Sequence, residues 1–187
     1  MNCSHTHCGP VMRATPSEDK PKSEAVAVAE QYMAQLKQKL EPLVGEALKR
    51  LAPAQLDYFH ARAGFAMNRR RNYALPPDDV NAKKAPNPDG PVDHDVPVLC
   101  VLDAEGNSRA VLFGYACHNT TLSFYLFCGD YAGWAQEYLE ADHPGMTAMF
   151  VMGCGADQNP YPRREGELAQ RHGRSLATGV EAALFAN

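Results

Sequence analysis

The chain has 187 residues, of which 45% are hydrophobic and 21% are charged, and its formal net charge is −4 at pH 7. These values are typical of one globular domain with a buried core. The negative net charge gives no reason to expect nucleic acid as a partner. No apolar run approaches the roughly 20 residues that a membrane-spanning helix needs. No signal peptide is visible at the start, and the cellular location stays unknown.

The six cysteines show no paired CxxC spacing. Three of them, Cys100, Cys117 and Cys154, lie in apolar stretches, where a buried free thiol is the usual state. We therefore expect neither a zinc ribbon nor a disulfide-linked scaffold. The pattern leaves the redox compartment open.

The first expected element is a long helix over residues 23–51. Apolar residues recur there with the 3.6-residue period of an amphipathic helix, and Ser23 is a plausible N-cap. Pro42 lies inside the pattern and should kink or divide the helix. We expect the apolar stripe to pack in the core.

Residues 55–70 fit either a continued helix or a strand with a bend. Tyr58, Phe59 and Phe65, together with Gly64, favour the strand. The segment 74–95 is rich in Pro, Asp and Asn, and we expect a long loop there. Loops of this length in compact domains are often functional or mobile.

The second half of the chain alternates strand and helix patterns. Two apolar stretches joined by AEGNS predict a hairpin, and the helical pattern that follows has Asp130 as its expected N-cap. A short apolar strand and an amphipathic helix complete the series. The predicted ranges are 96–103 and 109–118 for the hairpin strands, 129–142 for the first helix, 147–155 for the last strand and 165–185 for the last helix. This alternation predicts an α/β domain with a mixed sheet flanked by helices.

Three polar clusters lie at the chain start or directly after predicted strands. In the SHTH segment an extended chain would place His5 and His7 on one face, so the pair is either part of a metal site or a polar N-terminus. His118 ends a predicted strand and is either a ligand or a hydrogen-bonded core histidine. The GCGADQNP segment is either a site loop or a structural turn.

Together these strand-end loops would converge on one edge of the sheet. Two histidines from separate clusters would begin a catalytic zinc site, which needs about three N or O ligands and an open position. Asp130 and Asp157 are candidates for the third ligand. Gly153 and Gly155 would allow the backbone to approach closely. The basic cluster 69–71 can also be a solvated turn.

The motifs resemble, in chain order, those of the neutral (neutral/alkaline, non-lysosomal) ceramidases. SHTHCGP resembles that family's THTHSGP, and MNRRRNY resembles its Asn-Arg-Ser segment. VDHDVPVLCV is similar to a VDxxxxVLxF strand, and FGYACHNTTL to a strand ending in His-Gly-Thr-Ser. GDYAGWAQEYLE resembles GDxxGYAxxxLE, and FVMGCGADQNP resembles the Gly-Asp-Val-Ser-Pro-Asn loop. The likeness covers residues 4 to 160 as an ordered set.

The resemblance implies a role for each matching residue. His5 and His118 would ligate Zn²⁺, and His7 would contact the substrate beside the metal. Arg69 would bind the substrate near the scissile group, and Asp157 keeps the place of the loop aspartate. The family hydrolyses the amide bond of N-acylsphingosines, so the resemblance implies a zinc-dependent hydrolase that cleaves a lipid or other amide with metal-activated water.

Two departures from the family's pattern bear on this expectation. Asn159 stands where the family has a serine with a catalytic role; asparagine cannot form an acyl-enzyme, although it can orient the substrate or donate to an oxyanion. Family members are also much longer, and supply a glutamate and a tyrosine to the zinc from beyond residue 187. We therefore expect residues 1–187 to be part of an N-terminal catalytic domain whose site the missing C-terminal part completes. The alternative is a divergent domain that is non-catalytic or binds a different substrate.

Overall fold

The computed structural model describes residues 2–12, 24–70, 75–76, 78–79 and 86–186. The chain divides into two compact units, Gly9–Pro53 and a larger unit of Met1–Cys8 with Ala54–Asn187. The larger unit contains all of the described strands and two of the helices. It also contains every candidate site residue.

Helix α1 (Glu24–Lys49) is the helix of the Gly9–Pro53 unit. It runs without interruption past Pro42, so the expected division of the helix is wrong. The expectation that its apolar stripe is core is also wrong for most of the stripe, because Leu43, Val44 and Leu48 are exposed. The expected N-cap, Ser23, lies outside the described residues.

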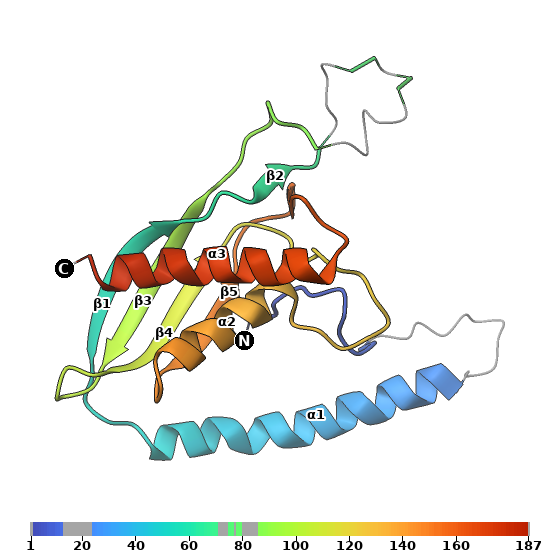
Figure 1. Cartoon of the computed structure of the whole chain (residues 1–187). Coiled ribbons are helices and arrows are strands. Elements are labelled where there is room, and N and C mark those ends of the chain that lie inside the picture. The colour runs from blue at the N-terminus through green and yellow to red at the C-terminus, as the bar shows by residue number, and fades with distance from the viewer. Residues whose placement is uncertain (1, 13–23, 71–74, 77, 80–85, 187) are drawn as a thin grey trace. The chain divides into compact units, whose positions relative to one another are not determined.

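A four-stranded mixed sheet forms the centre of the larger unit, as predicted (Figure 1). Its strands, in spatial order, are β1 (Gln55–Arg62), β3 (Asp95–Leu102), β4 (Ser108–Tyr115) and β5 (Thr147–Met152). The β3–β4 hairpin is antiparallel, as its turn sequence predicted, whereas β5 runs parallel to β4. The parallel pair matters for function, because the carboxyl ends of β4 and β5 meet at one edge of the sheet.

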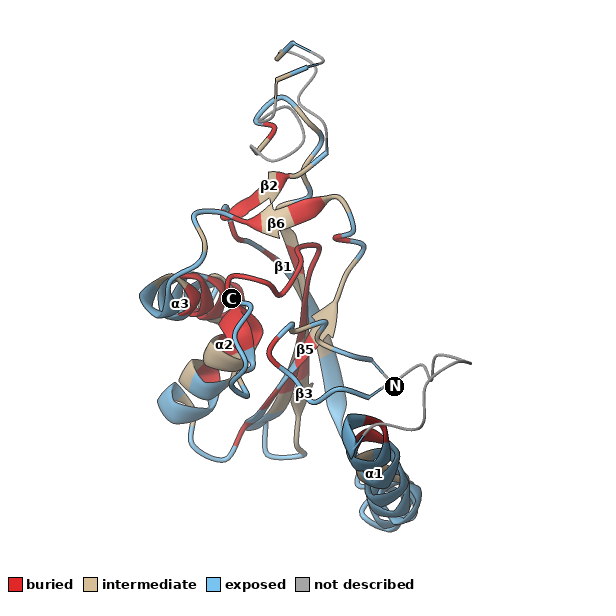
Figure 2. Cartoon of the chain, turned by 90° about the vertical axis from the view of Figure 1, so that its right-hand side faces the viewer, coloured by how far each residue is buried: buried red, intermediate tan, exposed pale blue. Residues whose placement is uncertain are grey.

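Two helices, α2 (Asp130–Asp142) and α3 (Gly166–Leu184), pack on the same face of this sheet (Figure 2). Alternate strand residues such as Val98 and Phe113 point into that layer and are fully buried. Their neighbours on the opposite face, such as Leu99 and Leu112, are only half-buried. The helices therefore decide which of two apolar strand faces becomes core.

A second, two-stranded sheet pairs β2 (Ala66–Asn68) with β6 (Gln158–Pro160). The bend after β1 matches the one predicted around Gly64, but β6 was not predicted. Its three residues carry no alternating apolar pattern, and the strand exists only because β2 pairs with it. Part of the predicted loop 74–95 lies outside the described residues, and its end folds back so that Asn87 bridges to Asn68.

The cysteines, all within the described residues, are free thiols. Cys100 and Cys117 are buried, as their apolar surroundings predicted, but Cys154 is exposed. That prediction was wrong because Cys154 follows the end of β5, where the chain leaves the sheet for a loop.

Candidate functional site

Three loops meet beyond the carboxyl ends of β4 and β5. Residues 116–122 follow β4, and residues 153–157 follow β5. The chain start joins them, because the side chain of Asn2 accepts a hydrogen bond from the backbone N–H of Met152 (3.1 Å). Thr6 donates its hydroxyl to the carbonyl of Cys128 (2.8 Å), which holds the SHTH segment on its other side. The clusters therefore converge, as the sequence predicted.

Histidines 5, 7 and 118 lie together at this junction. The ring of His5 meets that of His118 edge-on with centroids 4.6 Å apart, and lies 5.2 Å from the ring of His7. His5 has a φ of 60°, in the left-handed region. For a residue other than glycine this conformation costs on the order of 1 kcal/mol. Strain of this kind is typical of residues that a site holds in place.

The ring of His118 is oriented by the loop after β5. Its Nδ1 donates to the carbonyl of Gly155 (2.7 Å), and its backbone N–H donates to the carbonyl of Gln158 (3.0 Å). This leaves the Nε2 lone pair available to a ligand, which is the arrangement that metal-binding histidines use. The pKa of His118 is lowered, first by burial and further by the positive charge of Arg69 and His5, against the opposing effect of its hydrogen bond to the Gly155 carbonyl. A neutral imidazole at neutral pH is therefore favoured.

Close approach of the two loops requires glycine. A Cβ at Gly155 would lie 2.4 Å from the backbone nitrogen of Cys117, and one at Gly153 would lie 3.2 Å from the backbone of Ala116. The backbone contact predicted for these two glycines is confirmed. It places the Gly155 carbonyl beside the ring of His118.

His7 is exposed and lies in positive surroundings. Its pKa is lowered by partial burial and then by the positive charges of His5, Arg69 and Arg163, while Asp130 opposes this shift. This shift favours the neutral imidazole at neutral pH, which can accept a proton. Arg163, in the loop before α3, was not predicted as a site residue, because no motif of the sequence marks it.

Arg69 lies at the end of β2, and its guanidinium donates through Nε and Nη2 to the carbonyl of Ala156 (3.1 and 2.9 Å). Its backbone N–H donates to the carbonyl of Asp157 (2.7 Å). The carboxylate of Asp157 is 3.5 Å from the side-chain amide of Asn68. Arg69 is thus electrostatically close to the histidines, but its hydrogen bonds fix the 156–157 loop.

Asn159 lies on β6, opposite Met67 of β2. Its side-chain oxygen is buried and has no hydrogen-bond partner among the described residues. No hydrogen bond or ring contact in the described chain joins Asn159 or Asp157 to one of the three histidines. The site therefore consists of a histidine cluster together with Arg69, which follows β2, and Asn159, which lies on β6.

Asp130 does not have the predicted role of an N-cap. The cap position of α2 is Gly129, and the buried carboxylate of Asp130 instead accepts the backbone N–H groups of Thr121 (3.1 Å) and Leu122 (2.7 Å). Asn119, which the sequence did not single out, accepts the N–H of Ala132 in the first turn of α2 (3.2 Å). Both side chains fix the loop that follows His118, so Asp130 is committed to the backbone.

The described residues do not form a complete metal site. No group of three or more His, Cys, Asp or Glu side chains in that part of the chain is placed to hold one ion. The orientation of His118 and its contact with His5 fit two nitrogen ligands of a zinc site. A third protein ligand, which a catalytic zinc site needs, does not come from the described residues.

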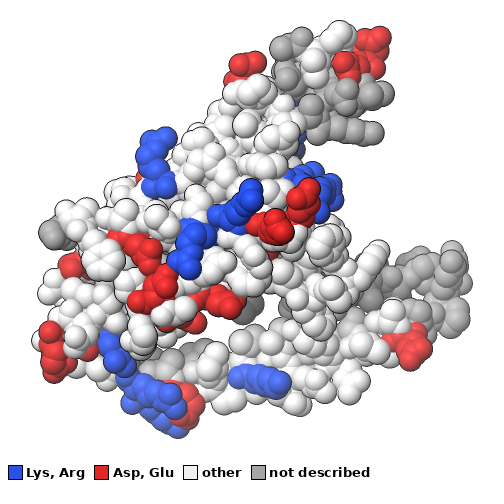
Figure 3. Space-filling view, in the orientation of Figure 1, with Lys and Arg blue, Asp and Glu red and all other residues white. Residues whose placement is uncertain are grey.

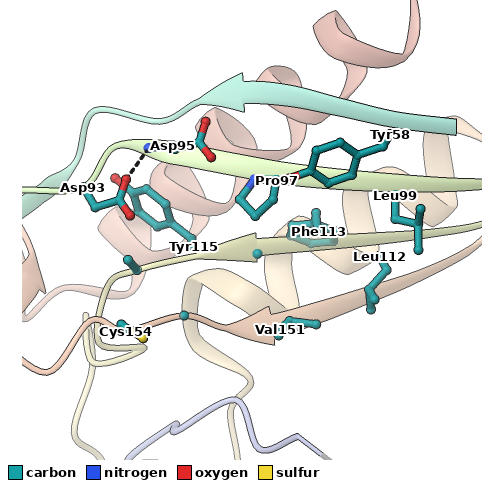
Figure 4. Close-up of a pocket in the computed structure, with 13 residues that line it drawn as sticks. Tyr58, Asp93, Asp95, Pro97, Leu99, Leu112, Phe113, Tyr115, Val151 and Cys154 are labelled. Carbon is teal, nitrogen blue, oxygen red and sulfur yellow. Dashed lines mark hydrogen bonds between the residues drawn. The ribbon is translucent and has the colours of Figure 1, made fainter.

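An apolar cavity lies on the sheet face opposite α2 and α3, and one end of it reaches Ala116, Gly153 and Cys154 at the start of the two site loops. It is a trough of about 450 Å³. Figure 4 shows its wall crossing four strands through Tyr58, Leu99, Leu112 and Val151. The lining is mostly apolar, and contains no histidine or arginine. None of the three histidines lines the trough, but the trough shares Ala116, Gly153 and Cys154 with the loops that hold the histidine cluster.

The surface gives two further observations on partners. Basic and acidic side chains lie in small separate groups on the face seen in Figure 3, without an extended basic surface. The expectation that nucleic acid is not a partner stays a prediction. None of the helices in the described part of the chain is long and apolar enough to cross a membrane.

No protein-family model matches the sequence, and neither does any curated protein. Among the solved structures that share the fold are two ceramidases. A ceramidase complexed with C2 matches with a TM-score of 0.59 at 19% identity, over 74% of this chain and 23% of that chain. The neutral ceramidase from Pseudomonas aeruginosa matches with a TM-score of 0.59 at 17% identity, over 86% of this chain and 26% of that chain.

The chain therefore spans about a quarter of the length of these two structures. It has the α/β fold of the corresponding part of a neutral ceramidase, which is the fold that the sequence resemblance implied. At these identities the likeness concerns the fold.

Proposed function

We propose that this chain is part of a zinc-dependent amide hydrolase of the neutral ceramidase type, with N-acylsphingosine-like lipids as the substrate class. The observation that supports this most is the contact of His5, at the chain start, with His118, in the loop after β4, whose Nδ1 donates to the Gly155 carbonyl. Histidines brought together and oriented in this way on a ceramidase fold favour a metal centre over a polar N-terminus.

In this proposal His5 and His118 would hold Zn²⁺ through ring nitrogens. The ion, when bound, supplies Lewis acidity that polarises an amide carbonyl and activates water. His7, whose pKa is lowered by partial burial and neighbouring positive charge, would accept a proton from the attacking water and pass it to the leaving amine. Arg69 holds the 156–157 loop and adds positive charge beside the scissile group.

Asn159 limits the chemistry to which the chain can contribute. An amide side chain cannot be acylated, so the reaction must proceed by direct attack of water. The unpaired oxygen of Asn159 can accept a hydrogen bond from substrate, and its amide nitrogen can donate to the developing oxyanion. A carboxylate and a further ligand from beyond residue 187 would complete the zinc site.

Calorimetry of Zn²⁺ binding tests the metal part of the proposal on the 187-residue chain. We expect a dissociation constant of about micromolar or weaker, because at least one protein ligand is absent. His5→Ala and His118→Ala should each abolish this binding. His60→Ala, at an exposed histidine on β1 that pairs with Asp95, is the matched control and should leave it intact. Unchanged binding in both site variants would make the assignment wrong.

A second candidate is a binding domain without catalysis. Asn159 in place of a serine favours it, and so does the commitment of the Arg69 guanidinium to the Ala156 carbonyl. A hydrolysis assay on a longer protein that includes the C-terminal part distinguishes the two candidates. Hydrolysis of a short-chain N-acylsphingosine that depends on His118 supports the hydrolase. Intact zinc binding with no hydrolysis, even after Asn159→Ser, supports the binding domain.

A further inference from the structure

Four consecutive apolar side chains project from the loop between His118 and α2. We refer to Phe124, Tyr125, Leu126 and Phe127 as the FYLF loop. Phe127 is 82% exposed and Leu126 is 73% exposed, while Tyr125 is fully exposed. Single exposed apolar residues are ordinary on a protein surface, but four in sequence form a patch that is typical of an interaction site.

The base of the FYLF loop is held tightly. The backbone N–H of Phe124 donates to the sulfur of Cys8 (3.2 Å), and the N–H of Cys128 donates to the carbonyl of Cys8 (2.9 Å). Leu122 is buried against Cys8 and Ala169 in a small apolar cluster. The base therefore has its own core, and the tip is not a part of it.

The tip of the loop, by contrast, makes no described hydrogen bond between residues 125 and 127. Its side chains are consecutive, so they do not form the one-sided stripe with which a helix or strand docks into a protein groove. A loop tip that points apolar groups in several directions suits a fluid apolar phase, which surrounds them all. Tyr125, with its apolar ring and polar hydroxyl, is a residue type enriched at membrane interfaces.

Two arginines lie beside the loop. The backbone N–H of Arg164 donates to the carbonyl of Thr121 (2.8 Å), which brings residues 163–164 to the base of the FYLF loop. Neither Arg163 nor Arg164 forms an ion pair within the described residues, although Glu165 follows them directly. Unpaired guanidinium groups next to an apolar loop are complementary to anionic lipid headgroups above an acyl layer.

We propose that the FYLF loop inserts into the interfacial layer of an anionic lipid bilayer, with Arg163 and Arg164 at the level of the headgroups. The loop is continuous with the candidate site, because Cys8 joins its base to the segment that carries His7. The inference deepens the proposed function, since a lipid amide would reach the histidines from the bilayer. Docking itself requires neither metal nor turnover, so its test can fail or succeed independently.

Flotation of the 187-residue chain with lipid vesicles is the first test. Vesicles of phosphatidylcholine alone are compared with vesicles containing about 30 mol% phosphatidylglycerol. We expect binding to the anionic vesicles, and a loss of at least tenfold in the partition coefficient for Leu126→Ser with Phe127→Ser. Arg164→Gln should weaken it by about fivefold, the effect of one surface charge. The emission of Trp134, packed against the loop base, verifies folding of each variant.

The matched control carries Leu48→Ser with Leu51→Ser, two exposed apolar residues outside the larger unit. It should bind vesicles as the parent chain does. Equal loss in this control would assign lipid binding to the Gly9–Pro53 unit and overturn the proposal.

Depth of insertion is the second test. In Phe127→Trp the added indole should shift its emission to the blue on anionic vesicles, and lipids brominated on the acyl chain should quench it. Vesicle binding without this quenching would overturn insertion of the loop. The proposal also fails if the chain does not bind vesicles and instead forms a dimer in light scattering that the Leu126 and Phe127 variant dissociates, since a second copy would then cover the loop.

Discussion

The two faces of the four-stranded sheet are built from the same strands but differ in what covers them. On one face α2 and α3 bury Val98, Phe113 and their neighbours completely. On the other face Tyr58 is 60% exposed, and an apolar trough runs over Leu112 without a helix from the larger unit above it. Apolar content alone thus does not make a core. The histidine cluster lies beyond the carboxyl ends of β4 and β5, at loops whose first residues also line one end of the trough.

The largest expected difference in the free energy of unfolding is between two neighbouring residues of β4 whose side chains point to opposite faces of the sheet. Phe113→Ala should lower the free energy of unfolding by about 3–5 kcal/mol, because it leaves a cavity under the helices. Leu112→Ala, next to it but facing the trough, should cost less than about 1 kcal/mol. Urea denaturation measures both. Equal losses would mean that the trough face is covered in solution and would break the comparison.

A smaller effect is expected at the edge where the site lies. Gly155→Ala places a methyl group 2.4 Å from the Cys117 nitrogen. The backbone must move, at a cost of about 1–3 kcal/mol. Zn²⁺ binding should weaken as well, because the Gly155 carbonyl would no longer orient His118. Gly133→Ala, in α2 with open space around its Cβ position, is the control and should gain about 0.5 kcal/mol or more. A Gly155→Ala chain with parent stability and zinc affinity would contradict this account of the edge.

The smallest expected effect is a change in the pH dependence of stability, and it comes from a buried histidine of α3, one of the two helices that cover the sheet. His172 of α3 stacks on Phe65, with ring centroids 4.5 Å apart, and bonds the Pro162 carbonyl (2.7 Å). Burial lowers its pKa, against the opposing effect of that hydrogen bond. The unfolded chain therefore binds the proton more readily, and stability present above the ordinary histidine pKa of about 6.5 is lost as the pH falls below it.

His172→Gln can keep a donor to Pro162 but cannot titrate. Its unfolding free energy should fall less between about pH 8 and pH 5 than that of the parent chain. His60→Gln, at an exposed histidine, serves as the control for this comparison. An identical pH dependence of the His172 variant and the parent would show that His172 is not the titrating group.

Much of the fold follows from local patterns. The β3–β4 hairpin, the bend between β1 and β2, and helices α2 and α3 lie where period and turn chemistry predicted them. The errors at α1, β6 and Asp130 have one physical cause: a local sequence pattern does not specify which distant segment the element or side chain will pack against. The stripe of α1 is apolar yet largely exposed, and β6 has no pattern but is paired. Asp130 is a residue type that is common at N-caps, but its carboxylate accepts a backbone N–H from the loop after His118.

The site divides in the same way. The sequence by itself determined the histidines, the two loop glycines and the arginine as candidate residues, together with the ceramidase resemblance that links them. It could do so because side-chain chemistry and the spacing of a motif are properties of the sequence and do not depend on the fold. The tertiary structure decided which of them meet. Parallel pairing of β4 with β5 brings Gly155 to the ring of His118, and the return of the chain start to Met152 and Cys128 brings in His5. The contacts of the chain start join residues 122 and 150 positions apart, and the contact of His118 with Gly155 joins residues 37 positions apart, so no local preference encodes them.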